Sequence, residues 1–147
     1  MELRHFNRPY VEVVLIGLAM EMSLAMATSF LPILGSQLDP SGALVGLVIS
    51  AWFLSRIFVD LPAGVVSDRI GRLKLLIIGV GLGAAGAFAC AVASNIYLLI
   101  LGRILWGLGA GFFYLTSAAF IIDIFDVKVR GRALGFYYTI LFIGDFI

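Results

Sequence analysis

Long apolar runs separated by short polar segments are the main pattern along this chain. Four runs, at 11–34, 43–66, 73–93 and 96–122, are each long enough to supply the ~20 apolar residues that a helix needs to cross a bilayer. A fifth run, at 133–147, is too short for a complete crossing. The pattern therefore predicts an all-α membrane protein with four complete transmembrane helices, an incomplete fifth and no soluble domain.

The composition agrees with this prediction. The chain is 62% hydrophobic and only 13% charged, whereas soluble domains are about 25% charged. So few polar residues could not cover the surface of an ordinary soluble domain. His5 is the only histidine and Cys90 the only cysteine, so we expect no metal site, no cofactor and no disulfide. We also expect neither enzymatic activity nor a nucleic-acid partner.

The basic residues alternate between the connections and predict the orientation of the chain. Eight of the ten Lys and Arg residues precede the first run or lie in or next to the connections at 67–72 and 123–132; they are Arg4, Arg8, Arg69, Arg72, Lys74, Lys128, Arg130 and Arg132. The connections at 35–42 and 94–95 carry none. Because cytoplasmic loops are enriched in Lys and Arg, the N-terminus is predicted to be cytoplasmic, in a multi-pass protein of the cell membrane. The first run exceeds the apolar region of a signal peptide, so we expect it to be retained.

A few charged residues fall inside the predicted spans. Burying a charge at the bilayer centre costs at least about 2.5–3.5 kcal/mol on insertion scales, so such residues usually face the bundle interior. Glu21 and Arg103 lie at similar depths in the first and fourth spans. They would form either a static ion pair or a site that couples substrate to a proton held by Glu21. Arg56 and Asp60 are four positions apart and are expected mainly to neutralise each other.

Small residues at four-residue intervals predict close contacts between helices, because lipid provides no hydrophobic reason for helices to associate. The stripes are Gly42, Gly46 and Ser50; Gly79 and Gly83; and Gly107 and Gly111. The glycines within 81–86 also have the spacing of a dinucleotide-binding loop. That fold needs an acidic residue about 20 positions further on, and this chain has none there. We therefore interpret these glycines as packing residues.

The most specific motif is the charged turn between the second and third runs. Its members are Gly64, Asp68, Arg69, Gly71, Arg72 and Lys74. Gly71 permits the positive φ of a tight reversal. Asp68 is placed to accept from unpaired N–H groups at a helix start, either that of the next helix or that of a helix outside this sequence. Arg72 can form a forked pair with Asp123 at the end of the fourth run. Such a pair predicts a charge latch that holds the helices together at this rim.

The turn resembles the loop between helices two and three of the major facilitator superfamily. Arg103, followed by Trp106, Gly107 and a further glycine and alanine, is similar to that superfamily's fourth-helix motif, although Trp106 stands where Gln is common. Asp123 with 130–133 is similar to its junction of helices four and five. The resemblance spans the chain and implies a twelve-helix transporter in two halves. It implies alternating access for a small organic solute or drug, often coupled to protons.

The resemblance also implies roles for particular residues. In that superfamily the loop aspartate and arginine, here Asp68 and Arg72, gate the cytoplasmic side. The fourth-helix arginine, here Arg103, is linked to proton coupling or substrate charge. An acidic residue in helix one, here Glu21, fits drug-exporting antiporters best.

The extent of the chain limits what the resemblance implies. The helix-five motif that marks antiporters would begin where this sequence stops, so the direction of transport stays open. We expect the chain to be the partial N-terminal six-helix half of a longer transporter, which would need its C-terminal half as a partner. The alternative is a truncated membrane protein that does not transport and associates through its glycine stripes.

Overall fold

The computed structural model of the chain describes residues 8–146, except for the side chain of Asp145. These residues form five helices: α1 (Arg8–Leu38), α2 (Val45–Ile70), α3 (Arg72–Ala91), α4 (Ile96–Ile124) and α5 (Val127–Asp145). By length and composition, four of them, α1 to α4, can cross a membrane. The predicted all-α class with four long spans is therefore confirmed. Arg4 and His5, which enter the predictions above, lie outside the described residues.

At the end of the bundle that carries the basic connections, the helices extend beyond the apolar runs that predict them. α2 continues to Ile70, so that Gly71 alone separates it from α3. α5 begins at Val127 rather than at residue 133, so most of the expected connection at 123–132 is helical. The difference has a simple cause. Charged residues end a hydrophobic run, but they do not end a helix, and helical turns continue past the hydrocarbon into the polar region.

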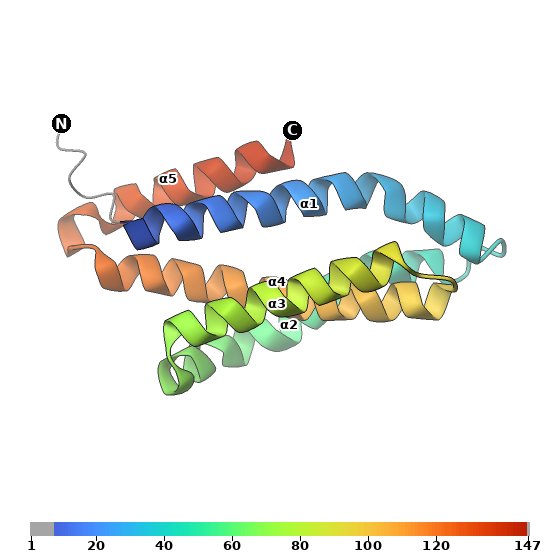
Figure 1. The fold of residues 1–147 in the computed structure, drawn as a ribbon, viewed down its shortest axis with the longest axis horizontal. Coiled ribbons are helices and arrows are strands. Elements are labelled where there is room, and N and C mark those ends of the chain that lie inside the picture. Colours follow the sequence, from blue (N-terminus) through green and yellow to red (C-terminus); the bar gives the residue numbers. More distant parts are fainter. Residues whose placement is uncertain (1–7, 147) are drawn as a thin grey trace.

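Consecutive helices run antiparallel, and the five pack in two groups, α1 with α5 and α2 with α3 and α4 (Figure 1). α3 and α4 share the most extensive contact, and α2 packs on the other side of α4. α1 lies mainly along α5 and contacts α2 and α4 less extensively. A buried hydrogen bond of 2.9 Å from the Tyr10 hydroxyl to the Ala133 carbonyl joins α1 to α5. α4 is thus the central helix of the described bundle.

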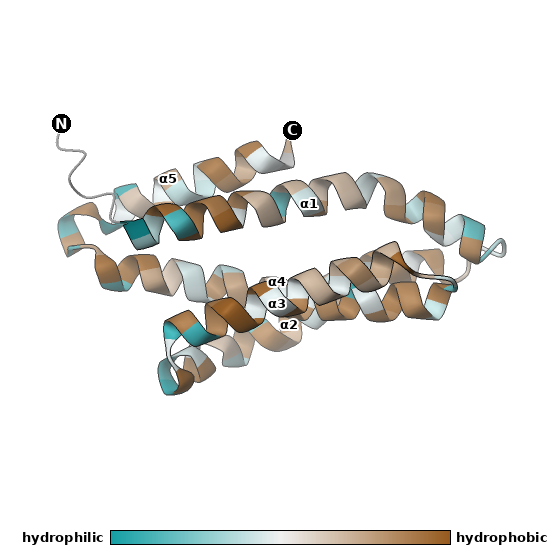
Figure 2. Ribbon diagram, viewed as in Figure 1, coloured by the Kyte–Doolittle hydropathy of each residue, from teal (hydrophilic) through white to brown (hydrophobic). Residues whose placement is uncertain are grey.

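The predicted separation of charge corresponds to two physical ends of the bundle. The start of α1, the α2–α3 turn and the α4–α5 turn lie at one end, and the other two connections lie at the opposite end (Figure 1). Hydrophilic residues concentrate toward the ends of the helices, with hydrophobic surface between them (Figure 2). Hydrogen bonds of polar side chains stabilise the two connections at the opposite end. Asn95 caps α4 by accepting from Leu98 N at 2.9 Å. Two hydrogen bonds to the Asp39 carboxylate lower the pKa of Asp39. The one from the Ser41 hydroxyl has the larger effect, and the one from Leu44 N–H the smaller.

Glycines allow α4 to approach both of its neighbours. A Cβ added to Gly79 of α3 would lie 2.9 Å from the backbone nitrogen of Phe113. On the other face of α4, a Cβ on Gly111 would lie 3.1 Å from Asp60 Oδ1, and one on Gly107 would meet the α2 backbone at Trp52. Three further glycines at the contact between α3 and α4, which we call the α3–α4 seam, were not part of any predicted stripe. They are Gly86, Gly102 and Gly109, and a Cβ on each would meet backbone atoms of the facing helix.

The stripe of Gly42, Gly46 and Ser50 has no such role. Among the described residues, no neighbouring atom lies within 4 Å of a Cβ added to Gly42 or Gly46, and Gly42 instead adopts a positive φ of 72° in the α1–α2 connection. Gly83 is intermediate, since an added Cβ would lie 3.3 Å from the end of the flexible Met20 side chain. A four-residue spacing therefore did not by itself identify which glycines face a neighbouring backbone.

Candidate functional site

A cavity of about 410 Å³ lies between α1, α2, α4 and α5. Its walls combine aromatic and aliphatic side chains with a few polar groups; the lining includes Glu21, Leu24, Trp52, Phe53, Arg56, Tyr114, Tyr138, Leu141 and Phe142. Ligand pockets in proteins have this character, mostly apolar with a small number of placed polar groups. The predicted charges Glu21 and Arg56 both face this space.

The polar groups of the cavity form a connected chain across three helices. The Tyr114 hydroxyl of α4 and the Glu21 carboxylate of α1 line the same cavity and interact electrostatically. The guanidinium carbon of Arg56 lies 5.2 Å from the centre of the Tyr114 ring. Arg56 Nε is in turn 3.4 Å from Asp60 Oδ2, the pairing expected from their spacing along α2. Two carboxylates and one guanidinium are therefore linked through a tyrosine.

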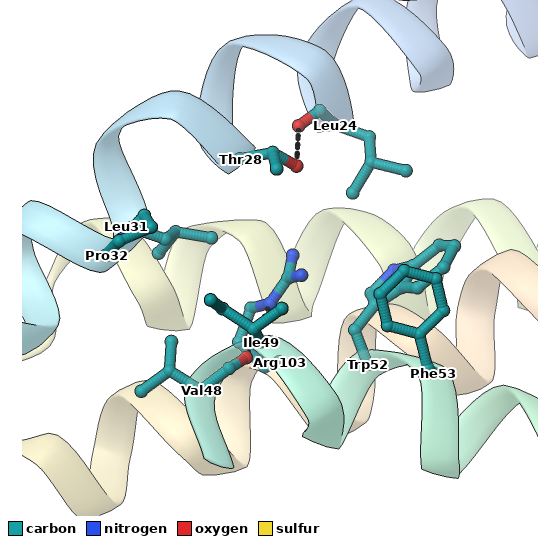
Figure 3. Close-up of a pocket in the computed structure, with 9 residues that line it drawn as sticks. All are labelled: Leu24, Thr28, Leu31, Pro32, Val48, Ile49, Trp52, Phe53 and Arg103. Atoms are coloured by element: carbon teal, nitrogen blue, oxygen red, sulfur yellow. Dashed lines mark hydrogen bonds between the residues drawn. The ribbon is translucent and has the colours of Figure 1, made fainter. Parts of the chain in front are cut away.

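Arg103 lies in a different environment from Glu21. Its side chain is only 3% exposed, and its Nε donates to the Val48 carbonyl of α2 at 3.1 Å. Its guanidinium carbon lies 5.9 Å from the Trp52 ring centre and 5.6 Å from that of Trp106. It lines a second, smaller cavity (Figure 3). Similar depth suggested a pair with Glu21, but depth does not determine which way each side chain points around its helix.

A second polar cluster surrounds Arg72 at the basic end of the bundle. Arg72 Nε donates to Asp123 Oδ2 at 2.6 Å, which is the pair expected from the sequence. Its Nη2 lies 3.1 Å from Asp68 Oδ1, and its Nη1 donates to Ser67 Oγ at 2.9 Å. These contacts join α2, α3 and α4, and we call the four residues the Arg72 cluster.

Asp68 does not cap α3, which was one of the two helix starts considered for it. The N-cap of α3 is Gly71, which has φ 94° and makes no side-chain capping bond. With Arg72 four residues ahead, ion pairing brings the Asp68 carboxylate toward the guanidinium instead. Arg69 and Lys74 of the motif are exposed. Within the described range 8–146, no neighbouring atom lies within 4 Å of a Cβ added to Gly64.

Trp52 and Ser67 were not singled out as site residues from the sequence. Trp52 contacts both intramembrane arginines, and Ser67 completes the Arg72 cluster. Ser67 precedes Asp68 directly, so its position in the motif offered a signal, whereas Trp52 offered little, because aromatic residues in a membrane span are common. Tyr114, which lies between Glu21 and Arg56, is a polar residue of the fourth span and could from the sequence either line a cavity or bond between helices.

Comparison with known proteins identifies the family of this fold. The Major Facilitator Superfamily profile matches residues 13–147. The inner membrane transport protein YajR of Escherichia coli is 36% identical over 126 residues, which are 82% of this chain and 27% of that protein. Multidrug resistance protein 1 of Bacillus subtilis is 28% identical over 115 residues, covering 78% of this chain and 30% of the relative.

The name of a third relative indicates a different kind of solute. The galactose-proton symporter of E. coli is 28% identical over 130 residues, covering 88% of this chain and 28% of the symporter. The chain thus spans less than a third of the length of each of these relatives. With a match over nearly its whole length, a helical bundle of membrane-spanning type and the charged turn of Arg72, this multi-pass membrane chain belongs to the major facilitator superfamily.

Proposed function

We propose that this chain forms the N-terminal portion of a twelve-helix secondary transporter, which moves a small organic solute across the cell membrane by alternating access coupled to protons. The observation that carries the proposal is the chain of ionisable groups from Glu21 through Tyr114 and Arg56 to Asp60, facing an intramembrane cavity. Ionisable groups inside membrane spans are rare and usually serve transport or proton relay. The relatives named above include a drug-resistance protein and a proton symporter.

The charges of this cavity support a solute that competes with a proton. Asp60 pairs directly with the Arg56 guanidinium. Glu21 is connected to the same guanidinium only through Tyr114. A carboxylate that faces an intramembrane cavity can take up a proton or pair with a cationic group of the solute. At Glu21 the proton and the cationic group would compete for the same oxygen atoms. Because both cannot be held at once at low cost, binding of one releases the other, which is the basis of coupled exchange.

The walls favour a solute that is cationic and partly aromatic. Trp52, Phe53, Tyr114 and Phe142 line the cavity, and aromatic faces attract cations. The relatives' names cover both drugs and galactose, so cargo differs within the family and the charge of the cavity is the better guide. We infer export of lipophilic cations as the activity of the complete protein.

Flux measurements on everted membrane vesicles containing the full-length protein test this function. An imposed pH gradient, acid inside, is expected to drive accumulation of a fluorescent lipophilic monocation. Collapsing the gradient with a protonophore should release it. Matched vesicles with a neutral sugar of similar size should show no gradient-driven accumulation. Accumulation of the sugar with no effect on the cation would contradict the proposed substrate class.

We also propose that the N-terminus and the Arg72 cluster face the cytoplasm. The support is the gathering of the basic connections at one end of the bundle (Figure 1). In a Cys90→Ser background, a cysteine replacing Ser41 should react with a membrane-impermeant maleimide on intact cells. One replacing Asp126 should react only after permeabilisation, and the reverse labelling pattern would overturn the orientation.

The Arg72 cluster is proposed to act as the cytoplasmic latch of this transporter. It joins the α2–α3 turn to the end of α4, so its contacts form when these helix ends are together and are lost when they separate. Conformational change in inverted-repeat transporters is largely rigid-body movement of helix bundles, which such contacts can bias.

Replacing Asp123 by Asn is expected to shift the conformational equilibrium toward the cytoplasm-open state and to slow exchange, with solute affinity retained. The Asp123 side chain is 52% exposed, and an exposed pair is worth about 0.2–1 kcal/mol, so the shift should not exceed about fivefold. Solute exchange and equilibrium binding measure the two effects. Asp126→Asn is the control, because it removes the same charge from the exposed start of α5. Equal effects of both variants would argue against the latch.

A further inference from the structure

A small cavity beside Arg103 adjoins the larger site described above and shares the wall residues Leu24, Trp52 and Phe53 with it. It has a volume of about 60 Å³ and is enclosed by α1, α2 and α4 (Figure 3). Its walls are almost entirely apolar; apart from Trp52 and Arg103 they comprise Leu24, Thr28, Leu31, Pro32, Val48, Ile49 and Phe53. The Thr28 hydroxyl already donates to the Leu24 carbonyl at 2.7 Å, so it is committed to its own helix.

Two buried hydrogen-bond donors at this cavity have no acceptor among the described residues. They are Arg103 Nη1 and Trp52 Nε1. The side chain of Arg103 reaches from α4 toward the space between α1 and α2, with its Nε on the Val48 carbonyl and its terminal nitrogens directed toward the cavity (Figure 3). Buried donors are rarely left unsatisfied in native proteins, and each specific case calls for an explanation.

Among the described residues, no carboxylate lies in ion-pair contact with Arg103. The indole rings of Trp52 and Trp106 provide cation–π contact, which offsets part of the cost of burying the charge. An isolated buried cation costs considerably more than this contact offsets. Water molecules in the cavity would satisfy the donors, but they would not neutralise the charge.

We propose that this cavity binds one small monovalent anion, a halide or a carboxylate of similar size, between the guanidinium of Arg103 and the indole N–H of Trp52. A single water needs about 10–15 Å³ of such space, so the cavity of about 60 Å³ accommodates a dehydrated halide but excludes large organic anions. The anion accepts from both orphan donors and neutralises Arg103. It stabilises the contact between α2 and α4, since Trp52 and Arg103 belong to different helices.

Anion-dependent thermal unfolding of the purified full-length protein in detergent tests the proposal. Sodium gluconate is replaced stepwise by sodium chloride or sodium formate at constant ionic strength and pH. The unfolding temperature is expected to rise saturably with chloride, because a ligand that binds only the folded state stabilises it according to its concentration and Kd. The formate series shows whether a carboxylate is accepted as well as a halide. Identical unfolding temperatures in gluconate, chloride and formate would overturn the proposal.

Three variants assign the response to this cavity. Arg103→Gln should abolish the saturable rise. Trp52→Phe retains a ring against the arginine but removes the N–H, and should raise the half-saturating chloride concentration about tenfold, the equivalent of one hydrogen bond to an ion. Arg132→Gln removes an exposed charge of α5 and should leave the response unchanged. If Arg103→Gln fails to fold, Trp52→Phe still decides the outcome: an unaltered half-saturation point would contradict the site. The measurement needs no transport activity, so it stands apart from the proposed function.

Discussion

Replacing Glu21 by Gln in the full-length protein is expected to eliminate all pH-gradient-driven accumulation of the cation. The two side chains have nearly the same shape, but an amide cannot carry a titrating proton. The new amide keeps an oxygen near the Tyr114 hydroxyl, so the helices should remain packed. Downhill exchange of solute in the absence of a gradient should persist at reduced rate. Vesicle flux assays with and without an imposed gradient separate these two quantities.

Glu12 provides the matched control for this variant. It lies on the same helix, pairs with Arg8 at 2.8 Å and is outside the 410 Å³ cavity. Glu12→Gln should therefore leave coupled flux near the wild-type value. Glu21→Asp, which keeps a titratable group on a shorter side chain, should recover part of the coupling. Full coupling in Glu21→Gln would show that the proton is held elsewhere and would remove Glu21 from the proposed site.

The second large effect is expected at the α3–α4 seam. Gly86→Ala should lower the free energy of unfolding by about 3 kcal/mol, at the upper end of the cost of overpacking. A Cβ at this position would overlap backbone atoms of Trp106 and Gly102 on α4. Backbone atoms cannot move aside as a flexible side chain can, so the two helices must separate. The midpoint of unfolding in a denaturing-detergent titration measures the loss.

Gly81→Ala is the comparison that isolates the seam. Gly81 lies on the same helix, and nothing is within 4 Å of an added Cβ. There the substitution should be neutral, or stabilise by up to about 1 kcal/mol through higher helix propensity. If both variants lose the same stability, helix flexibility rather than close approach would explain the glycines. This result would also count against the packing role that the sequence predicts for 81–86.

The contrast between these glycines illustrates what sequence patterns can specify. The stripes correctly marked α3 and α4 as helices rich in small residues, yet Gly86 and Gly109 lay outside the stripes and Gly46 lay inside one without meeting a neighbour. A spacing of four residues identifies one face of a helix. It does not identify which helix, if any, packs on that face.

The charged residues show the same limit of prediction from sequence. Arg72 and Asp123 were predicted to pair, and their atoms lie 2.6 Å apart. Both lie near the ends of neighbouring antiparallel helices, where short turns leave little freedom. Glu21 and Arg103 were matched only by depth, and they line separate cavities because Arg103 faces α2 while Glu21 contacts Tyr114.

The sequence by itself determined the membrane class, the order and approximate length of the helices, the end of the bundle that carries positive charge, and the family motif at the α2–α3 turn. Hydropathy and charge are properties of individual residues, and their pattern within one span is enough to identify that span. They can therefore be determined from the sequence without knowing how the helices pack. Only the tertiary structure decided that Arg56, through Tyr114, is linked to Glu21, and that Arg103 and Trp52 direct unpaired donors into a small cavity. Those contacts depend on how each helix is rotated about its axis, and that rotation is determined by the packing of all its neighbours at once.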